Sequence, residues 1–292
     1  MLKFVNLLKL MPILAFNVSI GGFSLDFGAG PSWINLIWID NTTYRSNDNL
    51  IRRSVYDIKK SVGFTIDTTL AYEINDYFKP NIEYTYINIR RGHGTLDVYN
   101  ILNSTDISIF EQLTFKPTIT ANAVIVGNEF KIKDTTLADQ ELGISGILAY
   151  GYNTFKLISK YPTEISESDT TANSFVGTIK FDLKTKYDFN LAIMDNLYLT
   201  KLKTITTPDG ELGTDAGMAF YNLVGNNITL AVVREIREKL SASLAFGYTH
   251  YKNFGQSKIV LSAADLLQFK NPKLCSTKLN EYTLVLYLSA SF

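Results

Sequence analysis

Apolar and polar residues alternate along most of this chain, and the clearest interior case is the segment from Val62 to Ile74. Its even-numbered positions, apart from Thr68, are apolar or aromatic, whereas its odd-numbered positions include Asp67 and Glu73. A period of two places successive side chains on opposite faces, so the segment predicts a β-strand and not a helix. Carboxylates are costly to bury in a dry core without partners. We therefore expect one apolar face and one wet face.

The last segment, residues 282–292, follows the same period most strictly. One of its two rows is almost wholly apolar or aromatic and consists of Tyr282, Leu284, Leu286, Leu288, Ala290 and Phe292. A terminal aromatic strand of this kind resembles the closing strand of bacterial outer-membrane β-barrels. In that family the strand is also the signal read by the barrel-assembly machinery. The resemblance implies a bacterial outer-membrane protein with membrane lipid and the assembly machinery as partners.

The spacing of the alternating segments predicts the architecture. Further strands are expected at residues 23–38, 82–86, 105–115, 118–132, 140–152, 154–161, 175–183, 187–191, 228–232 and 240–248. Very short turns are predicted near 75–79, 116–118, 152–154, 184–187 and 235–239. Longer polar segments fall near 40–57, 90–105, 161–172, 202–215 and 252–277, with a shorter one near 133–138. Short and long connections alternate in an up-and-down membrane barrel. We therefore predict an all-β, antiparallel up-and-down transmembrane β-barrel of about twelve strands, with ten or fourteen also compatible.

The beginning of the chain has the pattern of a secretory signal. Lys3 and Lys9 precede an apolar stretch, Leu10 to Phe16, and small residues follow at Gly21 and Gly22. We expect a cleaved signal peptide at 1–22 and a single barrel domain at 23–292. The alternative is an amphipathic first strand or helix.

Composition narrows the class of protein. The 28 basic and 28 acidic residues balance, which argues against nucleic-acid binding. No run of eighteen apolar residues occurs, so no transmembrane helix is expected. The chain has one cysteine, Cys275, so no internal disulfide can form. With only two histidines beside it, we expect no metal site, and no cofactor is predicted. A soluble β-sandwich also alternates, but charges opposite unbroken apolar rows and aromatic residues near strand ends favour the membrane barrel.

Two segments resemble catalytic motifs of barrel enzymes. The segment from His250 to Asn253 is similar to the H-x-S-N motif of lipid A deacylases and outer-membrane phospholipase A. Lys252 takes the place of the nucleophilic serine, so that chemistry lacks its central group. His93, with Asp97 four residues on, lies in a predicted outer loop where omptin-type proteases hold an Asp–His pair. No D-x-D pair accompanies it, and we expect no enzymatic activity.

The polar rows suggest a passage through the barrel. Charged residues predicted to line the lumen are Asp67, Glu73, Glu83, Lys180, Asp182, Lys184, Asp188 and Glu281. A barrel of twelve strands is wider than the eight-strand barrels that side chains fill. We expect a small passive, porin-like channel with a weak cation preference. Salt bridges that plug the lumen are equally consistent with these residues.

The alternative function is a surface barrel whose extracellular loops bind a host or envelope ligand. Arg52, Arg53, Arg90 and Arg91 would gather on one extracellular sector if their strands are neighbours. Guanidinium groups fit phosphates, including those of lipopolysaccharide. An ordinary charged rim, paired with Asp48 and Asp57, explains the same residues. Porin-like barrels often form homo-oligomers, and nothing in the sequence identifies an interface.

Overall fold

The computed structural model describes residues 22–44, 50–75, 77–103, 106–162, 165–187, 189–208, 217–254, 258–260 and 269–292. Almost all of these residues lie in β-strands. The strands are β1 (Phe23–Tyr44), β2 (Ile51–Tyr72), β3 (Phe78–Asn103), β4 (Asp106–Leu137), β5 (Gln140–Lys160), β6 (Ile165–Lys184), β7 (Asn190–Pro208), β8 (Gly217–Arg237), β9 (Leu240–Asn253), β10 (Lys258–Val260) and β11 (Phe269–Ser291). The described residues include no helix long and apolar enough to cross a membrane.

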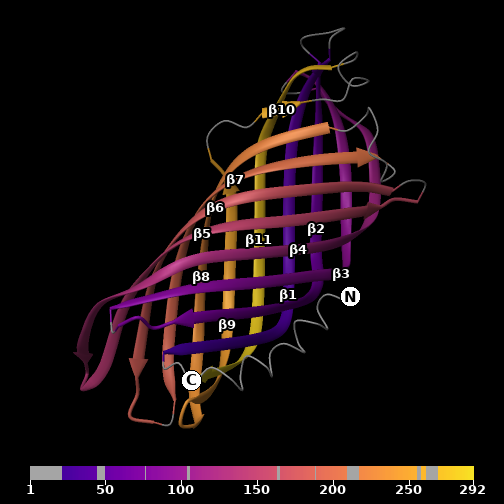
Figure 1. Ribbon diagram of the computed structural model, residues 1–292. Coiled ribbons are helices and arrows are strands. Elements are labelled where there is room, and N and C mark those ends of the chain that lie inside the picture. The colour runs from indigo at the N-terminus through magenta and orange to yellow at the C-terminus, as the bar shows by residue number, and fades with distance from the viewer. Residues whose placement is uncertain are drawn as a thin grey trace.

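Ten antiparallel strands close into a ring (Figure 1). Strands β1 to β9 pair in chain order, β9 pairs with β11, and β11 pairs with β1. The short β10 is not one of these ten strands: it pairs with residues 218–220 of β8, beyond the part of β8 that pairs with β9. The prediction of an all-β, up-and-down barrel is confirmed, and ten strands fall within the range that the alternation allowed.

Two of the turns predicted from the sequence are instead continuous strand, which explains the count of ten in place of twelve. Pro117 lies within β4 and is paired with Ser159, so residues 105–132 are not two strands. Asn153 lies within β5, where its side chain donates to Ser174 Oγ at 3.3 Å inside the ring. Proline and asparagine favour turns in general. Here Pro117 lies where the β3–β4 pairing is irregular, and the side-chain amide of Asn153 meets a polar interior.

The ring has two different ends. The tight connections 73–77, 138–139, 185–189 and 238–239 lie at one end, where Gly22 N also donates to Phe292 O. We call this the turn end and the opposite one the loop end. Ala138 and Asp139 both have positive φ, as a two-residue hairpin turn requires. Residues 1–21 of the predicted signal peptide, 1–22, and Asp188 lie outside the described residues.

Most of the predicted long loops at the loop end are extensions of strands. Strand β1 continues to Tyr44, β3 to Asn103 and β7 to Pro208, within segments that the sequence suggested were loops. The ladders with neighbouring strands continue there, so the backbone remains hydrogen-bonded. Apolar–polar alternation is needed only where one face of a strand is apolar and the other wet. Its loss therefore marks the end of the apolar surroundings and not the end of the strand.

Between the two ends, the outward-facing side chains form an apolar belt. The belt comprises every second residue of 25–33, 62–70, 82–86, 124–130, 148–152, 175–183, 191–199, 224–232, 244–248 and 282–288. Phe175 is 67% exposed and Leu286 58%, whereas the inward-facing Val285 is 2% exposed. The terminal strand therefore presents the apolar row expected from its sequence. Its role as an assembly signal stays a prediction.

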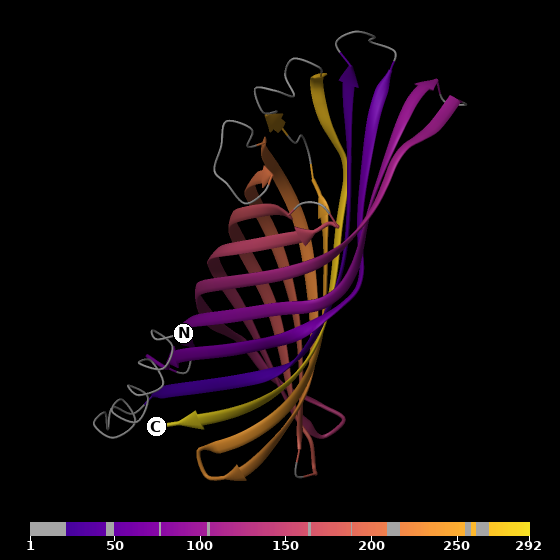
Figure 2. The same ribbon diagram turned by 90° about the vertical axis from the view of Figure 1, so that its right-hand side faces the viewer.

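A line of irregularities crosses four strands at the loop-end side of the belt. Register shifts occur between Ile34 and Leu36, between Lys59 and Val62, and between Ile89 and Gly94. Lys60 has φ 51, and its backbone N–H donates to Asn35 Oδ1 at 2.9 Å. Bulges bend strands and increase their twist. Beyond this line the β1–β2 and β3–β4 hairpins rise above the rest of the ring (Figure 2).

Gly63 marks a close approach of β2 and β3. A Cβ added at Gly63 would overlap the carbonyl oxygen of Asn88 and lie 2.6 Å from the Cα of Ile89. Gly63→Ala is therefore expected to lower the free energy of unfolding by roughly 1–3 kcal/mol, as overpacking does. Urea unfolding of the refolded barrel in detergent would measure it. Gly143→Ala is the matched control, because its nearest neighbours are 3.8 Å away; equal losses in both variants would contradict the prediction.

Candidate functional site

Three carboxyl groups face the inside of the ring from β2, β3 and β11, and β1 lies between β11 and β2. Tyr287 Oη donates to Asp67 Oδ2 at 2.9 Å, Thr85 Oγ1 to Glu83 Oε1 at 3.3 Å, and Ser32 Oγ to Glu281 Oε1 at 3.2 Å. Within the described residues, each carboxyl group has a hydroxyl partner and none forms an ion pair. The described part of the chain contains no group of three or more acidic, histidine or cysteine side chains that could hold a metal ion. The structure thus brings three of the predicted lumen residues together.

The remaining predicted lumen residues lie nearer the turn end. Lys180 faces inward and contacts Asp182 at 2.9 Å and Glu129 at 3.8 Å. Glu73 and Lys184 are exposed at the end of the ring, and Lys184 pairs with Glu141 at 2.8 Å. A cavity of 210 Å³ opens here, and its charged lining consists of Glu73, Lys79, Glu129, Lys131, Asp134 and Asp182. The turn end therefore has a polar mouth with charges of both signs.

An apolar layer fills the ring immediately on the loop-end side of the three carboxyl groups. Its centre is Ile34, Ile89 and Ile119, which are 3%, 0% and 0% exposed. Side chains packed against them or in two further clusters are Leu36, Trp38, Tyr56, Ile58, Ile87, Leu96, Phe115, Phe155, Leu157, Tyr161, Leu202, Tyr221, Leu223, Tyr251 and Leu279. Apart from Tyr161, which follows β5, these residues come from the strands of the ring, and every strand except β6 contributes. Sequence reasoning did not identify this layer.

Contacts within the layer join strands that are not neighbours in the ring. Leu157 of β5 and Leu279 of β11 both pack against the cluster of Ile34, Ile89 and Ile119, which comes from β1, β3 and β4. Trp38 of β1 meets Tyr221 of β8 edge-on, with ring centroids 4.8 Å apart. Side chains packed in this way exclude water from the space between them. The lumen therefore contains a polar cluster and, next to it, a dry apolar layer.

The four arginines do not form one cluster. Arg91 is paired with Val62, whereas Arg52 and Arg53 are paired with Asn100 and Tyr99. Nine residues therefore separate Arg53 from the position opposite Arg91, which is roughly 30 Å along a strand. Strands β2 and β3 are neighbours, as expected. They also continue through the segments that were predicted to be loops, and this places the arginines far apart. Arg53 instead donates to Asn41 Oδ1 at 3.0 Å.

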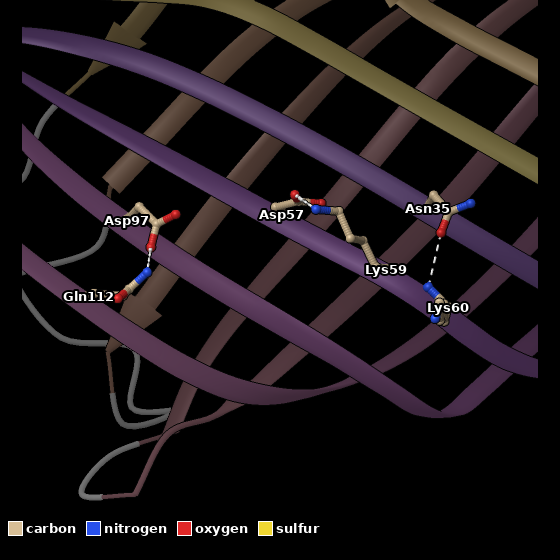
Figure 3. Close-up of polar contacts among 6 residues, drawn as sticks. All are labelled: Asn35, Asp57, Lys59, Lys60, Asp97 and Gln112. Atoms are coloured by element: carbon tan, nitrogen blue, oxygen red, sulfur yellow. Dashed lines mark hydrogen bonds and ion pairs between the residues drawn. The ribbon is translucent and has the colours of Figure 1, made fainter.

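We call the part of β11, β1, β2, β3 and β4 beyond the line of bulges the upper sheet. One face packs on the apolar layer through Leu36, Ile58 and Phe115. The opposite, open face carries polar contacts (Figure 3): Lys59 Nζ meets Asp57 Oδ2 at 2.5 Å, and Gln112 Nε2 donates to Asp97 Oδ1 at 2.9 Å. The hydrogen bond and charge of Asp57 raise the pKa of Lys59. This face therefore carries charged groups beside apolar ones, since Ile37 and Ile39 are paired with Asp57 and Val55 on it.

The two histidines are placed in separate surroundings. His93 lies within β3, paired with Lys59 and exposed, and not in a loop as the sequence suggested. Asp97 lies on the same open face and accepts its hydrogen bond from Gln112. His250 Nδ1 contacts Asn280 Oδ1 at 2.7 Å. Among the described residues, neither histidine has a hydrogen bond or ion pair with a carboxylate.

Strand β4 has a free edge in the upper sheet. Its residues 106–115 pair with β3, and its pairing with β5 begins only at Lys116 opposite Lys160. Within the described chain, no strand pairs with the other side of residues 106–115. Ile107, Ile109 and Phe110 on this segment are 55%, 66% and 61% exposed. Backbone groups and apolar side chains are thus exposed along the same strand.

The architecture is similar to that of solved outer-membrane proteins. The outer membrane protease OmpT from Escherichia coli has a TM-score of 0.66, with 93% of this chain and 97% of that one covered at 6% sequence identity. Weaker likenesses are the translocator domain of autotransporter NalP from Neisseria meningitidis (TM-score 0.41, 10% identity, 100% and 95% covered) and the transport unit of autotransporter AIDA-I from Escherichia coli (0.37, 11%, 99% and 97%). No protein-family model and no curated protein matches the sequence.

The closed antiparallel ring with its outward apolar belt defines a class: the fold is that of the bacterial outer-membrane β-barrels. In such barrels the short turns are periplasmic and the longer connections extracellular. At 6% identity the likeness to OmpT concerns the fold alone.

Proposed function

We propose that this chain is an outer-membrane surface barrel that binds a partner through its upper sheet. The observation that carries the proposal is the free edge of β4, residues 106–115, above a lumen filled by the apolar layer. A free strand edge accepts an added strand, whose main chain supplies affinity and whose side chains supply specificity. Ile107, Ile109 and Phe110 provide apolar contacts along this edge. The expected partner segment is an extended, partly apolar polypeptide.

Protection of the edge is weak, which supports a binding role. Exposed edges in soluble proteins are blunted by charged side chains, above all lysine, by proline or by a covering loop. Residues 106–115 contain neither lysine nor proline, their charged residues are Asp106 and Glu111, and both faces of residues 107–112 are exposed. The proposal includes no catalytic step, in keeping with the expectation that the chain is not an enzyme.

An array of immobilised extended peptides tests the proposal. The refolded barrel should bind peptides with alternating apolar residues, and the double variant Ile109→Lys with Phe110→Lys should bind them at least tenfold more weakly. Charges on an edge oppose strand addition. Ile165→Lys is the matched control at the loop end, since Ile165 is exposed and lies on β6. Equal binding by the double variant would refute the role of this edge.

A small passive channel is the second candidate, and the polar mouth at the turn end favours it. The cavity of 210 Å³ and the inward-facing Lys180, Glu129 and Asp182 are what an ion would meet there. If the chain is a surface barrel, we expect it to show no ion conductance in a planar bilayer. Steady conductance of the unmodified chain would favour the channel instead, with charged side chains setting its selectivity.

A further inference from the structure

One charged side chain lies in the middle of the apolar belt. Asp195 faces outward on β7 between Ile193 and Leu197 and is exposed. Its cross-strand neighbours are Ile179 on β6 and Ile228 on β8, which are 51% and 43% exposed. Asp195 is the central residue of the outward row 191–199. Among the described belt residues, no other carries a charge.

The position is costly for a barrel in contact with lipid alone. Hydrocarbon supplies no hydrogen-bond partner, so charged residues on the lipid-facing side of a barrel are destabilising, most of all near mid-depth. Ionisable residues within membranes therefore usually have a partner, and they indicate a functional site. The sequence around Asp195, L-A-I-M-D-N-L-Y-L, has apolar residues at the other outward positions. The polar group thus requires a specific explanation.

Asp195 has one polar neighbour within the described chain. Asn226, outward-facing on β8, donates from Nδ2 to Asp195 Oδ1 at 2.5 Å. The same nitrogen lies 3.4 Å from the backbone oxygen of Asn196. Among the described atoms, Asp195 Oδ2 and Asn226 Oδ1 have no hydrogen-bond partner. Both of these atoms are acceptors when the carboxyl group is ionised, so the donor available to a partner is the second N–H of Asn226, which reaches Asn196 O only over the longer distance of 3.4 Å.

We infer that this face of β6, β7 and β8 is an interface with a second copy of the chain in the membrane. The Asp195–Asn226 pair is self-complementary: under a twofold rotation, the second N–H of Asn226 in each copy turns from the 3.4 Å contact with Asn196 O to Asp195 Oδ2 of the other copy, while its first N–H stays on Asp195 Oδ1. Isologous interfaces of this kind are the commonest in symmetric oligomers. Within membranes, packing and interhelical or interstrand hydrogen bonds drive association, because lipid is as apolar as the side chains. Ile179, Leu197 and Ile228 supply the surrounding contacts. The inference rests on the proposed membrane location.

Cysteine crosslinking in membranes locates the interface. In a Cys275→Ser background, Leu197→Cys is expected to give a disulfide-linked dimer on mild oxidation. Ile66→Cys is the matched control, because Ile66 is a belt residue on β2, opposite β7 in the ring. Heat-modifiable migration on gels confirms that each variant has inserted and folded. A folded protein that crosslinks equally at both positions, or at neither, overturns the inference.

Substitution of Asp195 separates association from folding. Asp195→Leu should weaken dimerisation at least tenfold, whereas Asp195→Asn, which retains polar atoms, should keep most of it. Sedimentation equilibrium in density-matched detergent measures the dimer constant. Asp195→Leu should at the same time raise the thermal stability of the monomer, because it removes a carboxylate from the lipid-facing side. If Asp195 only supported the fold, the same substitution would lower that stability. Unchanged dimerisation of Asp195→Leu would refute the interface, and a chain soluble without detergent would refute the membrane location beneath it.

Discussion

Replacement of Ile89 by aspartate is expected to lower the free energy of unfolding by at least about 4 kcal/mol. Ile89 is 0% exposed and lies at the centre of the apolar layer, packed with Ile34 and Ile119. A carboxylate there would be without water and without a cationic partner among the described residues of the layer. Ile89→Ala should lower the free energy of unfolding by roughly 2–5 kcal/mol, because the smaller side chain leaves a cavity. Urea unfolding of the refolded protein in lipid vesicles would measure both variants.

Ile107 supplies the control for this prediction. Its side chain is 55% exposed on β4 in the upper sheet, so Ile107→Ala should change stability by less than about 0.5 kcal/mol. If Ile89→Asp were as stable as Ile107→Ala, the interior around Ile89 would have to be wet, and the assignment of a dry layer would be wrong.

Conversion of the apolar layer into a hydrophilic one is expected to turn a silent barrel into a conducting one. The variant combines Ile34→Ser, Ile89→Ser and Ile119→Ser, which removes three buried apolar side chains and adds three hydroxyl groups. Water enters a cavity when it is large enough and offers polar partners, and hydrophobic constrictions block ions by excluding water. Planar-bilayer recordings should show no steps for the unmodified chain and discrete steps for the variant.

A matched variant controls for general loosening of the barrel. Three serines at Ile107, Ile109 and Ile165 alter exposed positions at the loop end and should leave the protein silent. The double variant Ile34→Ser with Ile119→Ser serves if the triple one does not fold, as judged by heat-modifiable migration. Conductance of equal size in the unmodified chain and in the serine variants would show that the layer is no barrier.

The sequence pattern predicted the fold best where a strand has an apolar exterior on one face and a polar interior on the other. In residues 282–292 one row contacts the apolar exterior and the other the interior, so strict alternation is enforced and the expected strand is confirmed. The pattern was misleading at Pro117, which lies at the line of bulges, and at Asn153, whose amide meets a polar interior. It also failed at the loop end, where strands continue beyond the apolar belt.

The site was predicted only in part. Asp67, Glu83 and Glu281 face inward together, as an alternating polar row suggests. The apolar layer was missed because it breaks the rule: residues 33–39, W-I-N-L-I-W-I, are apolar on both rows apart from Asn35. Within this segment Ile34, Leu36 and Trp38 are the residues that belong to the interior clusters. The arginines were wrongly grouped because their separation depends on register, which a single sequence does not reveal.

The pairing of β1 with β11 affects how the molecule forms. Most of the ring consists of neighbours in sequence, whose hairpins can register locally and early. The seam is different: the Ser32–Glu281 hydrogen bond joins residues 249 positions apart, and the ladder extends from Ser24–Ser291 to Tyr44–Phe269. Bringing such distant segments together carries the largest loop-closure entropy in the ring and slows folding. Until that encounter the chain is a curved sheet with two unpaired edges, so the seam sets the moment at which the barrel becomes a single cooperative unit.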